Sequence, residues 1–97
     1  MNKISNKYKL ETTSVFRRQF KSIKKRGLKT ELLNEIVEKL LCGEPLLPKN
    51  RDHALTGNWA GHRECHITPD WLLVYRIIED ELILTLVRTG SHSDLDF

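Results

Sequence analysis

Four histidines are the residues of this chain best suited to proton transfer: His53, His62, His66 and His92. The unperturbed pKa of histidine lies close to neutral, so its side chain gives or accepts a proton at cellular pH. All four lie outside the expected helices, in loops or near the ends of expected strands. Such ends can meet on one side of an antiparallel sheet, which favours a shared site. For His62 we favour a surface or hydrogen-bonded role.

A metal site is the first alternative. Four potential ligands lie close together in the sequence: His62, Cys65, His66 and Asp70. The alternation of a strand, however, places His62 and His66 on one face and Cys65 on the other. The sequence has no paired CxxC and no HExxH motif. We therefore predict that the protein holds no metal and needs no cofactor.

A nucleophilic serine or cysteine is also disfavoured. Ser91 and Ser93 flank His92, but no GxSxG elbow surrounds them. Cys65 directly precedes His66, and adjacent residues of a strand point to opposite faces. The sequence also lacks a glycine-rich phosphate-binding loop.

Metal-free cleavage of RNA fits the remaining residues. In this reaction the 2′-hydroxyl attacks the adjacent phosphorus, which requires a base, an acid for the departing 5′-oxygen and a cation on the phosphate. Histidines, alone or with an aspartate, can supply the first two groups, and Arg63, Arg76 or Arg88 can supply the third. A non-catalytic protein-binding module explains the same composition equally well.

Length and composition limit the possibilities. With 97 residues the chain has room for a single domain, residues 1–97, with a modest core. Residues 1–51 carry 13 basic and 5 acidic side chains, a net +8, whereas residues 52–97 carry 3 and 8, a net −5. The basic half favours nucleic acid or an acidic protein as partner, with a solvated helix surface as the alternative. Two cysteines and no apolar signal or membrane segment predict reduced thiols and a cytoplasmic location without membrane contact.

The hydrophobic pattern predicts two helices followed by a run of strands. Apolar stripes indicate a helix over residues 15–26, capped by Ser14, and a second over residues 31–42, capped by Thr30. Alternating or continuous apolar runs predict strands at residues 8–12, 54–57, 61–67, 71–78 and 82–87. The order β-α-α-β-β-β-β indicates an α+β fold. In it the helical hairpin covers one face of an antiparallel sheet and the other face is open for function.

Residues 52–75 resemble the signature of the YafQ-type toxins, which belong to the RelE/ParE superfamily of bacterial toxin–antitoxin systems. They read DHALTGNWAGHRECHITPDWLLVY and follow the family pattern DHxLxGxWxGxRxxHxxPDWxLxY. Residues 88–95, RTGSHSDL, resemble the C-terminal element of the family. The resemblance covers essentially the whole chain and implies a RelE-like fold with two helices against an antiparallel sheet.

The resemblance also implies a function. Members of this family are ribosome-dependent endoribonucleases that cut messenger RNA in the ribosomal A site. A cognate antitoxin neutralises them, which implies a 2:2 complex that binds operator DNA. The superfamily also contains toxins that bind and inhibit DNA gyrase without cutting RNA, so gyrase inhibition is the alternative function. An inactive adaptor that only binds an antitoxin is a third.

The family pattern implies four catalytic residues: His53, His66, Asp70 and His92. We expect His53 and His92 to transfer protons, because histidine titrates near neutral pH. His66 and Asp70 are expected to orient a partner or to stabilise charge.

The pattern also implies contacts with RNA. Arg88 precedes the TGSH element and is suited to hold phosphate charge. Arg63 matches the motif but alternates away from His66, so a role in bracing the sheet is the alternative. The C-terminal aromatic of the family corresponds to Phe97, which would stack on a base, although one additional residue precedes it here. Trp59 and Trp71 are expected to pack in the core or on the sheet.

Overall fold

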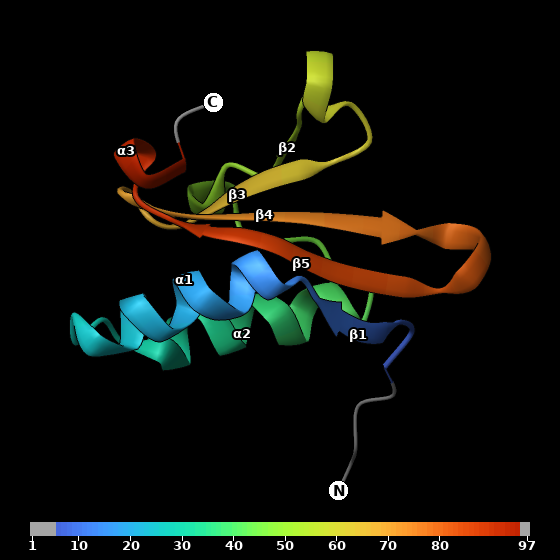
Figure 1. Cartoon of the computed structure of the whole chain (residues 1–97). Coiled ribbons are helices and arrows are strands. Elements are labelled where there is room, and N and C mark those ends of the chain that lie inside the picture. The colour runs from blue at the N-terminus through green and yellow to red at the C-terminus, as the bar shows by residue number, and fades with distance from the viewer. Residues whose placement is uncertain (1–5, 96–97) are drawn as a thin grey trace, which may run out of the picture.

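The fold is a helical hairpin packed against one face of a five-stranded sheet (Figure 1). It is seen in a computed structural model, which describes residues 6–95. The helices and strands follow in chain order: β1 (Lys9–Thr12), α1 (Ser14–Lys25), α2 (Thr30–Leu41), β2 (His53–Ala54), β3 (Arg63–Thr68), β4 (Trp71–Ile78), β5 (Ile83–Gly90) and α3 (His92–Leu95). Short 3-10 turns occupy Pro48–Asn50, Gly57–Trp59 and Glu79–Glu81. No helix among these described residues is long and apolar enough to cross a membrane.

The strands lie in the order β1-β5-β4-β3-β2. Neighbours from β2 to β5 pair antiparallel, as short turns between consecutive strands require. The predicted α+β fold is therefore confirmed. β1 differs from a simple antiparallel meander because it pairs parallel with β5. Its partner lies at the other end of the chain, and the intervening helices allow either direction.

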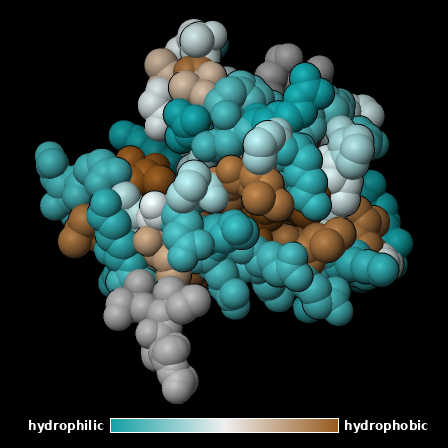
Figure 2. Space-filling model, turned by 180° about the vertical axis from the view of Figure 1, so that it is seen from behind, coloured by the Kyte–Doolittle hydropathy of each residue, from teal (hydrophilic) through white to brown (hydrophobic). Residues whose placement is uncertain are grey.

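The two faces of the sheet carry different side chains. The face toward α1 and α2 contributes Leu73 and Tyr75 to the main core, both almost fully buried. The opposite face, which we call the histidine face, has a smaller apolar cluster formed by Leu72, Val74 and Leu95. The loop after β2 and the short α3 therefore cover part of the face that the sequence predicted to be open. Seen from behind, apolar residues reach the surface in a band across the middle of the molecule, with hydrophilic residues around it (Figure 2).

Both long helices begin one residue away from the predicted position. Thr13, and not Ser14, caps α1: its Oγ1 accepts a hydrogen bond from a backbone N–H of the first turn at 3.0 Å. The same hydroxyl donates to the Val87 carbonyl at 2.7 Å. This contact with β5 explains why Thr13 takes the cap position. In α2, Thr30 is the first helical residue, and Lys29 occupies the N-cap position without a side-chain hydrogen bond.

The loop after α2 holds less strand than predicted. β2 contains only His53–Ala54, and the chain then enters the turn Gly57–Trp59. Gly57 has a φ of +64°, a left-handed conformation that favours glycine and ends extended structure. The last strand is longer than predicted: β5 continues to Gly90, and the short helix α3, which was not predicted, follows it.

A β-bulge in β5 decides which way Arg88 points. Leu86 is buried against the helices, and simple alternation would send Arg88 to the same face. The register shifts, however, because Tyr75 pairs with Leu86 while Val74 pairs with Arg88. The extra residue, Val87, turns Arg88 to the histidine face.

The residue after Arg88 is held by a buried polar network. The Thr89 hydroxyl donates to the Leu72 carbonyl at 2.8 Å and accepts from the Trp71 indole N–H at 2.9 Å. The Thr89 backbone N–H donates to Oε1 of Gln19 on α1 at 2.9 Å. This network fixes the end of β5 to both β4 and α1.

Replacing the Thr89 hydroxyl by a methyl group tests this network. We expect Thr89→Val to lower the free energy of unfolding by about 2 kcal/mol, because it leaves the buried indole N–H of Trp71 without its acceptor. Urea unfolding followed by circular dichroism measures the change. The control is Thr85→Val on the same strand, which is expected to change stability by less than about 0.5 kcal/mol. Equal effects of the two substitutions would contradict this role of Thr89.

Candidate active site

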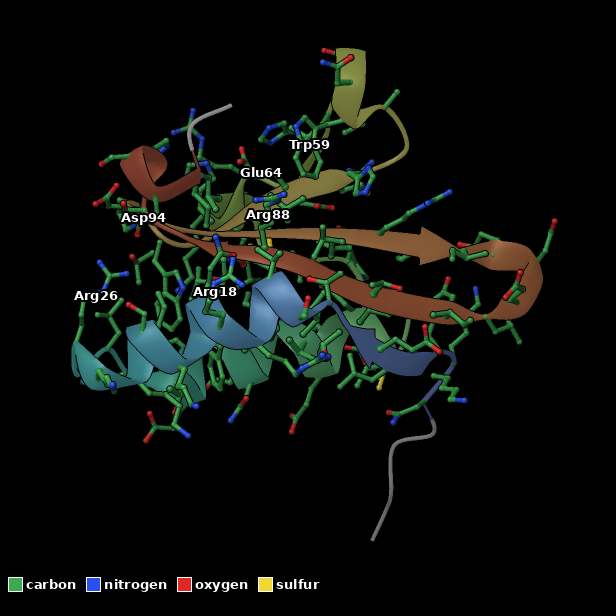
Figure 3. The ribbon with its side chains drawn as sticks, in the orientation of Figure 1. Arg18, Arg26, Trp59, Glu64, Arg88 and Asp94 are labelled. Carbon is green, nitrogen blue, oxygen red and sulfur yellow. The ribbon has the colours of Figure 1, made fainter. Side chains whose placement is uncertain are left out.

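One row of residues crosses the sheet on the histidine face. His53 of β2 pairs with Glu64 of β3, Glu64 with Val74 of β4, and Val74 with Arg88 of β5. Paired residues of adjacent strands share a face. The fold thus brings a histidine, a carboxylate and an arginine together from distant parts of the sequence. Figure 3 shows Glu64 and Arg88 on the side of the sheet away from α1 and α2, with Trp59 beside them.

His53 is held at both ring nitrogens. Its Nδ1 lies 2.8 Å from the carbonyl oxygen of Arg51, and its Nε2 lies 3.3 Å from Oε1 of Glu64. Both neighbours are acceptors, so only the doubly protonated ring can donate to both at once. The Glu64 side chain is only 11% exposed, whereas that of His53 is 48% exposed. With a proton on each nitrogen, the ring can act as a general acid.

A second group lies at the end of β3 and the start of α3. Nδ1 of His92 is 3.0 Å from Oδ1 of Asp70, and the rings of His66 and His92 are 5.6 Å apart between centroids. The hydrogen bond from His92 lowers the pKa of Asp70 below its ordinary value. Asp70 therefore stays ionised at neutral pH and holds the proton of His92 on Nδ1. The other nitrogen, Nε2, is left as the acceptor of the neutral ring, which suits a base.

The backbone of His66 is fixed from behind by the turn Pro48–Asn50. The buried side chain of Asn50 donates to the His66 carbonyl oxygen at 2.8 Å. His66 is half-buried, pairs with Leu72 of β4 and lies beside the exposed ring of His92.

Arg88 stacks on an aromatic ring. Its Cζ lies 5.1 Å from the centre of the Trp59 ring, and its Nε is buried without a hydrogen-bond partner among the described residues. Such stacking holds the guanidinium plane in one orientation. The side chain as a whole is only partly buried, so an anion on this face can approach the charge of the guanidinium. Trp59 was expected only to pack, and it does belong to the smaller apolar cluster as well.

Arg63 lies on the other face of the sheet. Its guanidinium forms an ion pair with Asp52 at 3.2 Å, and the Tyr75 hydroxyl donates to the same carboxylate at 2.5 Å. The Asp52 hydrogen bond raises the pKa of Arg63, and burial followed by the same carboxylate raises that of Tyr75. These contacts are those of a brace, which was the alternative predicted for Arg63. Because Asp52 precedes His53, the brace also fixes the start of β2.

The remaining expectations concern metal ligands and the C-terminus. Cys65 faces the main core while His66 lies on the histidine face, so the two do not converge. Burial raises the pKa of Cys65 to about 12, which makes its thiol unreactive. Within residues 6–95 no cluster of three histidine, cysteine or acidic side chains is placed to hold a metal ion. Phe97 lies outside the described residues.

Two members of the site were not selected from the sequence. Alternation places Glu64 on the face of His66, but nothing in the sequence shows that β2 pairs in the register that sets His53 against it. The stacking of Trp59 on Arg88 depends on the bulge in β5 and on the turn Gly57–Trp59. Both contacts are tertiary, so local pattern carries no signal for them.

Together these residues make a shallow site for acid–base chemistry on an anion. It contains His92 with Nδ1 on Asp70, His53 with both ring nitrogens facing acceptors, and the stacked Arg88. The side chains of His92 and Asp70 are 61% and 77% exposed, so the chain does not enclose a substrate.

Comparison with known proteins gives consistent matches. The family model for the bacterial toxin of type II toxin–antitoxin systems, YafQ, matches residues 8–96. A curated relative from Escherichia coli K12, named mRNA interferase toxin YafQ, is 41% identical over 51 residues, about half of each chain (53%). The relative of the same name from Escherichia coli B/BL21-DE3 is 31% identical over 87 residues, which cover 89% of this chain and 92% of that protein.

Solved structures agree in fold. A crystal structure of a metal-bound toxin from Helicobacter pylori is 44% identical with a TM-score of 0.86, and the match covers 91% of this chain and 98% of that one. The Escherichia coli DinJ–YafQ toxin–antitoxin complex contains a chain that is 30% identical with a TM-score of 0.83, covering 92% and 97%. The family match spans nearly the whole sequence and includes every described residue of the site. The chain therefore belongs to the YafQ family of bacterial toxins of type II toxin–antitoxin systems.

Proposed function

We propose that this protein is the toxin of a type II toxin–antitoxin system and an endoribonuclease that cuts messenger RNA on the ribosome. The observation that carries the proposal is the pairing of Asp70 with His92 beside His66, next to the row of His53, Glu64 and Arg88. The name mRNA interferase toxin YafQ, carried by the Escherichia coli relatives, supports the same activity.

The geometry suggests a division of roles. Nε2 of His92 takes the proton from the 2′-hydroxyl, whose oxygen then attacks the adjacent phosphorus in line. His53 gives a proton to the departing 5′-oxygen as the phosphorus–oxygen bond breaks. Arg88 faces the charge that builds up on the phosphate oxygens. The products are a 2′,3′-cyclic phosphate and a 5′-hydroxyl, so no metal or cofactor is needed to balance the reaction.

The exposure of the site supports dependence on the ribosome. The side chains of His53 and His92 are 48% and 61% exposed, so this site gains little from burying its substrate, and another macromolecule must orient the RNA. The ribosomal A site presents a messenger in a defined conformation. The basic first half of the chain, with a net charge of +8, is suited to contact ribosomal RNA.

An antitoxin is the proposed protein partner. The related Escherichia coli toxin is seen in the DinJ–YafQ toxin–antitoxin complex, which supports a cognate antitoxin for this chain. We infer further that the two proteins form a 2:2 complex that binds operator DNA and that the toxin acts in the cytoplasm. Arg63 and Phe97 stay proposed RNA contacts, Arg63 secondary to its role as a brace and Phe97 through base stacking.

Primer extension on messengers, after brief expression without an antitoxin, tests the function. RNA cleavage predicts new 5′ ends within translated frames. DNA damage signalling without such ends would indicate gyrase inhibition instead. Normal growth without new ends would indicate an inactive adaptor.

Removing either proton-transferring imidazole should leave folding intact and reduce cleavage. We expect His53→Ala and His92→Ala each to lower the cleavage rate on programmed ribosomes by about 100-fold or more, as for loss of a general acid or base. Both side chains are exposed, so the melting temperature should change little. Single-turnover cleavage of a labelled messenger measures the rate. Near-normal rates for both variants would overturn the assignment.

The contribution of Arg88 to cleavage should depend on its planar guanidinium as well as on its charge. We expect Arg88→Lys to lower kcat/KM by about 10-fold, because lysine keeps the charge but loses the fixed plane and the buried Nε–H. Trp59→Phe retains a ring face and should cost less than Trp59→Leu. Steady-state cleavage on ribosomes measures all three. Full activity of Arg88→Lys would show that charge alone suffices.

A further inference from the structure

The helix that carries His92 is too short to be stable without contacts from side chains. α3 contains only four residues, His92–Leu95, and a helix of that length is not stable in isolation. His92 is its first residue and its side chain is 61% exposed. Side-chain contacts must therefore hold this helix in place and decide where the His92 imidazole points.

Asp94 supplies such contacts within α3. Its Oδ2 accepts a hydrogen bond from the Ser91 backbone N–H at 2.9 Å, and its own N–H donates to Oγ of Ser91 at 3.1 Å. These reciprocal bonds form a capping box around His92. Gly90 allows the close approach, because a Cβ at that position would lie 2.8 Å from Cβ of Asp94. The backbone on both sides of His92 is thus fixed by the Asp94 carboxylate and the Ser91 hydroxyl.

Arg26 ties this carboxylate to the helical layer. Its guanidinium lies 3.1 Å from Oδ2 of Asp94, across the space between the end of α1 and α3 (Figure 3). The backbone N–H of Arg26 is bonded to carbonyls of the last turn of α1, so its position is fixed. Both residues line a hollow of about 300 Å³, together with Gln19, Ser22 and Thr89. The ion pair therefore bridges two elements at a place where the space between them is not filled by side chains.

We propose that Asp94, held by Arg26, is a positioning residue for His92, which orients the imidazole toward Asp70 and the substrate. The proposal rests on the proposed function and extends it by two residues that touch no reacting atom. The hydrogen bond from the Ser91 backbone, and then Arg26, lower the pKa of Asp94, so the carboxylate is charged whenever the enzyme works. An exposed ion pair contributes little to stability. Its loss should therefore affect the orientation of His92 more than the fold.

Four variants separate the cap from the ion pair. Asp94→Asn keeps an oxygen for the Ser91 N–H but loses the ion pair, Arg26→Gln loses the ion pair from the other side, and Asp94→Ala loses both contacts. We expect kcat to fall about 10-fold to 100-fold in Asp94→Ala and about 3-fold to 10-fold in each of the other two, with KM unchanged within about 2-fold. The double variant Arg26→Gln/Asp94→Asn should be no slower than the slower single variant. Ser93→Ala, on the same short helix, is the control and should keep the kcat of the original protein.

A second measurement needs no RNA. The ¹⁵N shifts of the His92 ring at neutral pH report which nitrogen carries the proton. We expect the Nδ1–H form to dominate in the original protein and in Ser93→Ala, and a mixture of forms in Asp94→Ala, with melting temperatures within about 4 °C of each other.

The two measurements give distinct outcomes. Unchanged kcat and unchanged His92 shifts in Asp94→Ala would overturn the positioning role. A fall in kcat that follows the melting temperature, with His92 shifts unchanged, would also overturn it, since Asp94 would then serve stability alone. If the original protein cuts no RNA on ribosomes, the proposed function fails, and the ring shifts still decide whether Asp94 positions His92.

Discussion

The site depends on one buried hydroxyl, that of Thr89. It joins the Trp71 indole and the Leu72 carbonyl, while the backbone of the same residue is bonded to Gln19 of α1. Thr89 lies between Arg88, which lies on the histidine face, and the turn that leads to α3. Because buried polar groups must be satisfied together, the end of β5 has one low-energy position. Because Arg88 directly precedes Thr89 and α3 follows shortly after it, this position also fixes Arg88 and the start of the helix that carries His92.

The two faces of the sheet have different roles: one stabilises the fold and the other carries the candidate site. Its helix-facing side carries the main core, whereas the histidine face carries only a small apolar cluster and the polar groups of the site. The bulge at Val87 is the exception to strict alternation and brings Arg88 across. On the helix-facing side Asp52, Arg63 and Tyr75 brace the segment that delivers His53. The brace thus holds the segment of His53 and the bulge sets the direction of Arg88, and each lies beside the side chain that it positions.

The sequence predicted the helices, the central strand and the catalytic candidates because these follow from periodicity and from a long motif. It misplaced the helix caps, since the choice of Thr13 depends on a bond to β5. It missed α3, which four residues of local pattern cannot indicate, and it could not assign Glu64 as the partner of His53 because strand register is a tertiary property. The alternation of side chains along a strand also gives the wrong face for Arg88, because the bulge in β5 depends on its pairing with β4. The residue types were thus predictable, whereas their partners were not.

A domain of this size can catalyse a difficult reaction if another macromolecule holds the substrate. The exposed side chains of His53 and His92 are consistent with a substrate that is held in this way. In the proposed reaction, side chains alone transfer the protons. The chemistry of the cut ends tests this most directly, by mass spectrometry of messenger fragments produced on ribosomes. Attack by the 2′-hydroxyl predicts a 2′,3′-cyclic phosphate, or the 3′-phosphate formed from it, and a 5′-hydroxyl. Fragments that carry a 3′-hydroxyl and a 5′-phosphate would contradict it, because attack by water and not by the 2′-hydroxyl would then have cut the chain.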